Sequence, residues 1–158
     1  MDGNLIDRYE TTVKDGKLTM GFGCNLSTLW KARNLKSYTV DITMSKLDSI
    51  ELNGAGAITV DSFEYDMLKL TVNGSGTIEA RGTAGNLKIN GTGKCKVLTR
   101  SLLARKGTIS LTGASRVETS IKETLDASIT GAGYIIYSGD PKVSQSITGA
   151  GRIEKASE

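Results

Sequence analysis

The chain has 158 residues and a net charge of +3, which fits one domain large enough to bury its own core. It contains no histidine, the commonest general base and metal ligand, so the composition argues against an enzyme, a cofactor or a metal centre. The charge is too weak and dispersed for a nucleic-acid-binding protein, and no run of 18 apolar residues could form a transmembrane segment.

The first 46 residues follow no regular repeat. Strands are predicted over residues 5–6, 9–13 and 17–22, with Asp15-Gly16 as a tight turn between the last two. Tyr38, Val40, Ile42 and Met44 alternate as a further strand. Because solenoids need atypical ends to close their cores, we predict that residues 1–46 form the first strands and an irregular cap of a single domain, 1–158. Cys24 and Cys95 form no CxxC pair, which disfavours a zinc site and leaves a disulfide between them open.

Residues 47–158 repeat a glycine motif about every nineteen residues, in six copies. The first glycines of the copies lie 20, 17, 22, 18 and 18 residues apart. Internal repeats of this length are typical of a solenoid. The predicted turn glycines, which supply positive φ values and room at tight bends, are Gly54, Gly56, Gly74, Gly76, Gly91, Gly93, Gly113, Gly131, Gly133, Gly149 and Gly151.

Apolar and polar residues alternate on both sides of each turn. Two residues before the first glycine stand Leu52, Val72, Ile89, Leu111, Ile129 and Ile147, and four residues after it stand Ile58, Ile78, Cys95, Val117, Ile135 and Ile153. This alternation predicts two half-buried strands per repeat. Separate hairpins are the local alternative, but only units stacked in one register bury a continuous core. We therefore predict an all-β fold, a parallel β-helix with two strands per coil joined by GxG turns.

The candidate contact residues are Trp30, Lys94, Arg116 and Tyr134. Lys94 and Arg116 are predicted neighbours in an outward column with Tyr134 above them, which suits either an anionic sugar or a solvated face. Trp30, among cationic residues, suits either a sugar contact or a cover over the end of the core.

Two further ladders of polar residues are predicted on the surface. Glu79, Lys96 and Glu118 form a column that alternates in sign, so we expect neighbouring charges to pair rather than to hold a cation together. A second column, which could bind a ligand or hydrogen-bond the turn backbone, consists of Asn53, Asn73, Asn90, Thr112, Thr130 and Thr148.

Residues 125–153, "LDASITGAGYIIYSGDPKVSQSITGAGRI", combine a Leu-x-Ala strand, two GAG turns and a Tyr-x-Gly-x-Pro segment. This ordered set resembles the C-terminal signature of the auto-transporter adhesin, head GIN domain family, found largely in Bacteroidetes. The segments "YETTVKDGKLTMGF", "LDSIELNGAG" and "LKLTVNGSG" resemble its earlier strands, so the resemblance covers about residues 5–155. Ser115 in place of glycine, and Gln145 and Lys155 at inward positions, depart from the pattern.

The resemblance implies a β-helix at the cell surface, associated with the outer membrane or in the periplasm, with an adhesive or scaffolding role and no catalytic residues. Its expected partner is a host or cell-surface glycan or protein. Members of the family usually carry a secretory or lipoprotein signal and one more strand segment, so we expect this sequence to be trimmed at its start. The alternatives are a polysaccharide-binding or polysaccharide-cleaving β-helix and a bactofilin-like polymer. Unpaired backbone at the terminal coils also predicts a weak homo-oligomer.

Overall fold

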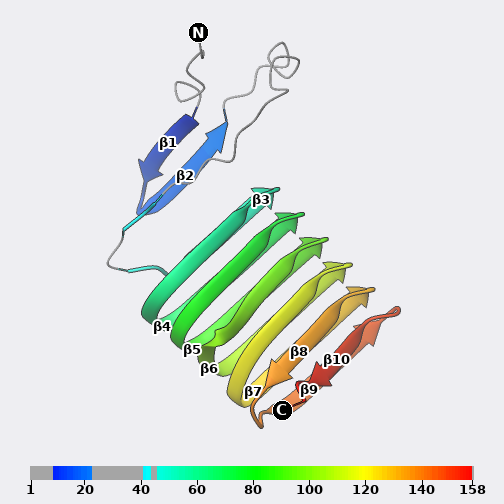
Figure 1. Cartoon of the computed structure of the whole chain (residues 1–158). Coiled ribbons are helices and arrows are strands. Elements are labelled where there is room, and N and C mark those ends of the chain that lie inside the picture. The colour runs from blue at the N-terminus through cyan, green and yellow to red at the C-terminus, as the bar shows by residue number, and fades with distance from the viewer. Residues whose placement is uncertain (1–8, 23–40, 44–45, 158) are drawn as a thin grey trace. The chain divides into compact units, whose positions relative to one another are not determined.

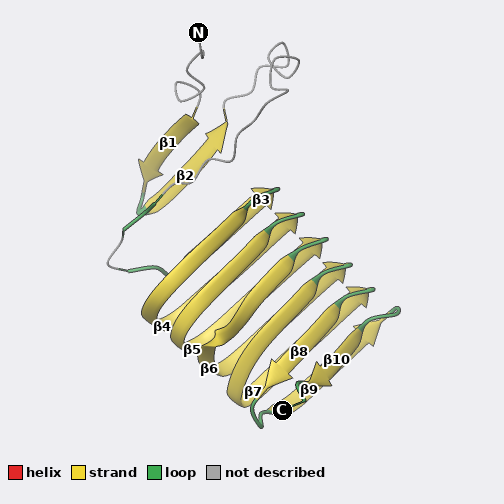
Figure 2. Cartoon of the chain, in the orientation of Figure 1, coloured by secondary structure: helices red, strands yellow, loops and turns green. Residues whose placement is uncertain are grey.

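The computed structural model describes residues 9–22, 41–43 and 46–157. The chain divides into two compact units, Met1–Thr43 and Met44–Glu158, and each is described by itself. The described residues contain strands and connecting turns and no helix (Figure 2).

The first unit contains one antiparallel hairpin. Strands β1 (Tyr9–Lys14) and β2 (Lys17–Phe22) pair in register across the two-residue turn Asp15-Gly16. Both turn residues have positive φ values, 51° and 73°, which is the geometry that Asp-Gly favours in a type I′ turn. The predicted hairpin is therefore confirmed. The strand expected around residues 38–44 falls mostly outside the described residues, and its described part, residues 41–43, is not in a strand. The predicted capping role of this unit stays a prediction.

The second unit is a parallel solenoid, as predicted. Its strands pair in parallel in the order β10-β8-β7-β6-β5-β4-β3, with β9 also paired to β7 (Figure 1). The strands are β3 (Ser49–Gly54), β4 (Ala57–Gly74), β5 (Thr77–Gly93), β6 (Lys96–Gly113), β7 (Arg116–Gly131), β8 (Tyr134–Ser138), β9 (Lys142–Thr148) and β10 (Arg152–Lys155).

Each of the long strands β4 to β7 forms one complete coil. The strand bends midway, where its pairing register shifts, and a glycine turn then leads into the next coil. In the coil after β7 the two halves are separate strands: β8 pairs with the first half of β7 and β9 with its second half, and β10, paired with β8, begins a further coil. The prediction of two strand segments per coil is confirmed, with the bend in most coils made inside one continuous strand.

The core lies between the first and second halves of the coils. Inward residues of the second halves stack as Ile50, Leu70, Ile89, Ile109 and Ala127, and those of the first halves as Ile58, Ile78, Val97, Val117 and Ile135. They belong to one hydrophobic cluster that continues through every coil. Each large side chain buried in this way contributes about 1.5–3 kcal/mol of transfer free energy, which makes the stack the main source of stability.

The third repeat has a different register from the one that its glycines suggest. Val72 pairs with Gly91 and Gly74 pairs with Gly93, so Gly93 is at the corner and Gly91 lies inside strand β5. The corner glycines, all with positive φ, are Gly54, Gly74, Gly93, Gly113, Gly131 and Gly149. The predicted turn position of Gly91 is therefore wrong. A slip of two residues keeps every side chain on its own side of the sheet, which is why the predicted faces still hold.

In this register two equivalent positions exchange large and small residues: Val72 and Gly76 in one coil correspond to Gly91 and Cys95 in the next. A Cβ atom at Gly91 would lie 2.6 Å from Cys95 Sγ and 2.9 Å from Leu111 Cδ2, so these two side chains fill the space that Val72 fills one coil earlier. Val72 and Leu52 in turn need the absence of a side chain at Gly76, where a Cβ atom would lie 3.3 Å from Val72 Cγ1 and 2.4 Å from Leu52 Cδ2. Cys95 therefore does not occupy the inward column predicted for it, and Val97 does.

Ser115 stands where other repeats have the second glycine of the turn, and its hydrogen bonds explain why serine is accommodated there. It is 2% exposed, accepts a bond from Cys95 Sγ at 3.0 Å and donates to the Gly93 carbonyl at 3.1 Å. Cys95 is buried and carries a free thiol. Because the buried hydroxyl has both a donor and an acceptor beside it, it costs little in place of glycine.

The polar residues at inward columns lie in the outermost C-terminal coil. Gln145 pairs with Ala127 and Lys155 with Tyr137, and both polar side chains are exposed. The Lys155 ammonium forms an ion pair with Asp140, and this contact holds the pKa of that carboxyl below its ordinary value. Polar groups facing outward from a terminal repeat keep an exposed core end compatible with water.

Candidate binding surface

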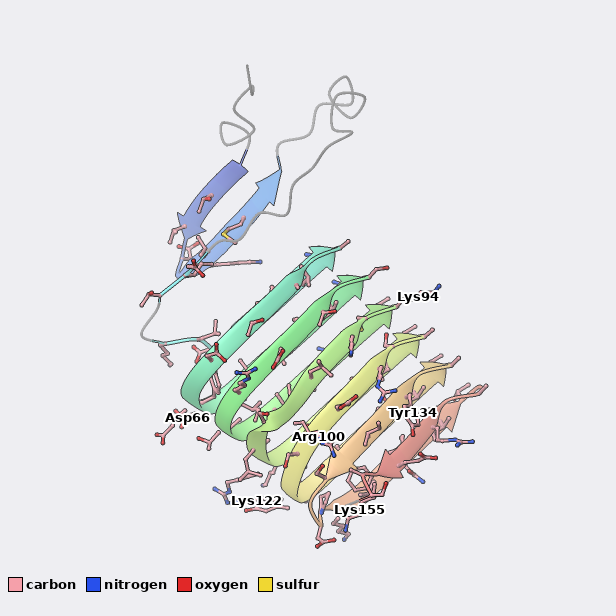
Figure 3. All side chains as sticks on the ribbon, in the orientation of Figure 1. Asp66, Lys94, Arg100, Lys122, Tyr134 and Lys155 are labelled. Carbon is pink, nitrogen blue, oxygen red and sulfur yellow. The ribbon has the colours of Figure 1, made fainter. Side chains whose placement is uncertain are left out.

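The outward side of the first halves of the coils forms a surface that we call the front face. One column of this face contains Ala57, Thr77, Lys96, Arg116, Tyr134 and Arg152, and the next contains Thr59, Glu79, Leu98, Glu118, Ile136 and Glu154. Neighbours in a column are about 4.8 Å apart, as in any sheet. The front face therefore presents cationic, aromatic and apolar groups on a rigid, regularly spaced support (Figure 3).

Arg116 and Tyr134, two of the predicted contact residues, are neighbours in a column. The Arg116 guanidinium carbon lies 5.4 Å from the centroid of the Tyr134 ring, a cation–π contact. Lys94 does not belong to this column, because it lies in the turn after Gly93, and Lys96 is the residue that pairs with Arg116. The predicted pairing of Lys94 with Arg116 is wrong, and its cause is the two-residue slip of the third repeat. Trp30 lies outside the described residues.

The hydroxyl of Tyr134, like its ring, has a partner on the front face. Its hydroxyl donates to Glu154 Oε2 at 2.5 Å, and Glu154 also forms an ion pair with Arg152 at 3.1 Å. The hydrogen bond to the carboxylate is the main reason why the pKa of Tyr134 is raised above its ordinary value of 10.0. The phenol is thus held with its ring beside Arg116 and its hydroxyl bonded to Glu154.

The carboxylates of the front face are each paired with an arginine in the same strand. Glu79 bonds Arg81 at 2.8 Å and Glu118 bonds Arg116 at 2.9 Å. The predicted column of Glu79, Lys96 and Glu118 is wrong, because Leu98 stands between the two glutamates. Among the described residues, no three side chains of the metal-binding types come together.

The asparagine and threonine ladder lies at the end of the second halves, beside the glycine turns. With the corrected register it consists of Asn53, Asn73, Thr92, Thr112, Thr130 and Thr148. Asn73 Nδ2 donates to Asn53 Oδ1 at 2.8 Å, and Asn53 Nδ2 donates to Glu51 at 2.9 Å. Asn53 and Asn73 therefore hydrogen-bond each other across neighbouring coils, and this contact gives the ladder a structural role.

A shallow groove at the bends was not predicted from the sequence. Its residues include Glu64 and Asp66 from one coil, Thr83 to Gly85 from the next, and Arg105 and Lys122 from the two after that. Asp66 and Lys122 are labelled in Figure 3. These residues are up to 58 positions apart, and nothing in their local pattern marks them, since only the stacking of coils brings them together.

No helix within the described part of the chain is long and apolar enough to cross a membrane. No curated protein matches the sequence. Several solved structures share the fold. One described as a putative adhesin from Bacteroides fragilis is 24% identical, with a TM-score of 0.65 over 96% of this chain and 78% of that one. A putative adhesin from Parabacteroides merdae is 19% identical, with a TM-score of 0.61 over 99% and 81%.

A third structure, described as a putative lipid binding protein from Parabacteroides distasonis, is 23% identical, with a TM-score of 0.62 over 99% and 82% of the two chains. At these identities the likeness establishes the fold. The family model described as "Putative auto-transporter adhesin, head GIN domain" matches residues 1–141, nearly the whole chain. The resemblance noted in the sequence is therefore confirmed, and the chain belongs to the auto-transporter adhesin, head GIN domain family.

Proposed function

We propose that the protein is a non-enzymatic adhesion module that is displayed at the cell surface and binds its partner on the outside of the solenoid. The family is described as one of adhesins, which favours a surface location and a binding role. The interior offers no alternative place for a ligand in the central coils, because side chains such as Leu70, Ile89 and Ile109 fill it at 0–1% exposure. An acyl chain, for example, would have to displace them.

The observation that carries this proposal is the pairing of the front-face carboxylates. A β-helix that cleaves polysaccharides needs carboxylates free to bind a cation or to transfer a proton. Here Glu79, Glu118 and Glu154 are each bonded to an arginine two residues away. Such a face is suited to binding without chemistry.

Adhesion can be tested with beads coated with the purified chain. We expect these beads to adhere to cultured host cells, and beads coated with the heat-unfolded chain to adhere far less. Equal adhesion of both preparations would contradict the proposal.

Catalysis needs a separate assay. We expect the chain to release no reducing or unsaturated ends from a panel of acidic polysaccharides. Release that is abolished by Glu79→Gln or Glu118→Gln would show that the protein is an enzyme.

A further inference from the structure

Charge is distributed unevenly among the coils. The coil over residues 94–113 contains Lys94, Lys96, Arg100, Arg105 and Lys106, and no acidic residue. The coil two before it, residues 55–74, contains Asp61, Glu64, Asp66 and only one cation, Lys69. The net charge of +3 conceals this difference, because one coil alone carries five positive charges.

Three of these cations lie in a line across one side of the molecule. Lys94 is in the glycine turn, Lys96 and Arg100 are outward residues of the first half of β6, and Leu98 lies between them. Lys96 and Arg100 are about 13 Å apart along the strand, at about 3.3 Å per residue. Lys94 and Arg100 are labelled in Figure 3.

These three side chains have no partner within the described part of the chain. The front-face arginines of other coils, Arg81, Arg116 and Arg152, are all in ion pairs. In contrast, Lys94, Lys96 and Arg100 form neither an ion pair nor a side-chain hydrogen bond. The front-face carboxylates of the two adjacent coils, Glu79 and Glu118 on either side of Leu98, are already bonded to Arg81 and Arg116. The line of cations is thus left free to bind an anion from outside.

We propose that this cationic coil is a binding site for an acidic polysaccharide, which lies along strand β6 across the solenoid. This inference rests on the proposed adhesive function and gives it a ligand class. Positive charges spaced along an extended strand are complementary to a linear polymer that carries a charge at each repeat. Leu98, half-buried between the cations, offers an apolar surface for the sugar rings.

Two other polyanions fit the coil less well. Single-stranded nucleic acid is bound through aromatic side chains on which its bases stack, and this coil contains no aromatic residue. A membrane surface is flat and contacts one side of a protein. The cations continue instead past the bend, where Arg105 is bonded to Glu123 at 2.9 Å, to Lys106 in the second half of β6.

The test uses chondroitin sulfate, an alternating carboxylate and sulfate polymer, with the intact chain. We expect binding at low ionic strength that weakens steeply as salt is added, and no binding to neutral dextran. The triple variant Lys94→Gln, Lys96→Gln, Arg100→Gln should bind at least ten-fold more weakly.

The matched control variant is Lys69→Gln, Lys88→Gln, Lys142→Gln. It removes the same net charge from exposed residues outside the coil, and we expect less than a two-fold change. Unfolding curves of both triple variants show whether the fold is kept. Equal weakening by the two variants, or tighter binding of single-stranded DNA or of phosphatidylserine vesicles than of chondroitin sulfate, would overturn the assignment.

The bead assay separates this inference from the proposed function. If beads carrying the Lys94, Lys96 and Arg100 variant adhere to cells as well as the original chain does, the adhesive function stands and the cationic coil is not its site. If chondroitin sulfate binds to the coil but the original beads do not adhere, the site stands and the adhesive function falls.

Discussion

Gly91 and Cys95 reverse the sizes found at the equivalent positions one coil earlier. There the larger residue is Val72, inside the strand, and the smaller is Gly76, after the corner. Here the glycine is in the strand and the thiol of Cys95 reaches back into the space above it. Because a close-packed interior has little spare volume, the two substitutions are expected to depend on each other.

This dependence gives a prediction for the free energy of unfolding. Gly91→Ala should destabilise the protein by about 1–3 kcal/mol, because the added methyl group would overlap Cys95 Sγ and Leu111 Cδ2. Adding Cys95→Gly should recover part of this loss, since it removes the nearer of the two contacts. Urea unfolding of both single variants and the double variant measures the coupling. Simple additivity would show that the side chains do not share this space.

At the scale of the strand, β7 shows how alternation divides core from surface. Ile129 is 1% exposed and stacks between Leu111 and Ile147, whereas its neighbour Ser128 is in an outward column with Ser110 and Ser146. The hydroxyl of Ser128 makes a long contact, 3.5 Å, with the Ile109 carbonyl. Most of what β7 contributes to stability therefore comes from its inward residues.

We predict that Ile129→Ala lowers the free energy of unfolding by about 2–5 kcal/mol, because it leaves a cavity in the stack. Ser128→Ala in the same strand should change it by less than about 0.5 kcal/mol, as is usual for surface substitutions. Chemical denaturation of the two variants provides the comparison. Similar losses at both positions would mean that the register of β7 is wrong, since a slip of one residue exchanges the two faces.

At the scale of the whole solenoid, the C-terminal coil leaves strand edges unpaired. Strand β9 pairs only with β7 and β10 only with β8 within the described part of the chain. Ile147, an inward residue of this coil, is 40% exposed. Exposed edges favour pairing with another chain, whereas the polar Gln145 and Lys155 oppose it. The two effects together predict weak self-association.

Light scattering over a concentration series tests this prediction. We expect the protein to associate at high micromolar concentration and Ile147→Lys to reduce the association. Thr130→Lys is the control, because it adds the same charge to an exposed residue of β7, a strand that is paired on both sides. A strict monomer, or equal association of the original chain and Ile147→Lys, would contradict it.

The sequence by itself determined the fold class, the number of coils and the side of the sheet on which most residues lie. The reason is that the glycine repeat and the alternation around it, as at Ser128 and Ile129, are local properties that recur in every coil. The same repetition made the family recognisable. The Asp15-Gly16 hairpin was predictable for a similar reason, because the turn chemistry of two residues fixes its register.

Only the tertiary structure decided which residues are neighbours across coils. In the third repeat two glycines compete for one corner, and the choice of Gly93 depends on how Cys95, Leu111 and Ser115 pack against Gly91, which no local pattern records. That choice moved Lys96 rather than Lys94 beside Arg116 and placed Leu98 between two glutamates. The cations of residues 94–113 were visible in the composition, but the lack of partners at Lys94, Lys96 and Arg100 is a property of packing. The pairing register determines which side chains of different coils are in contact, and the packing of the whole core determines that register.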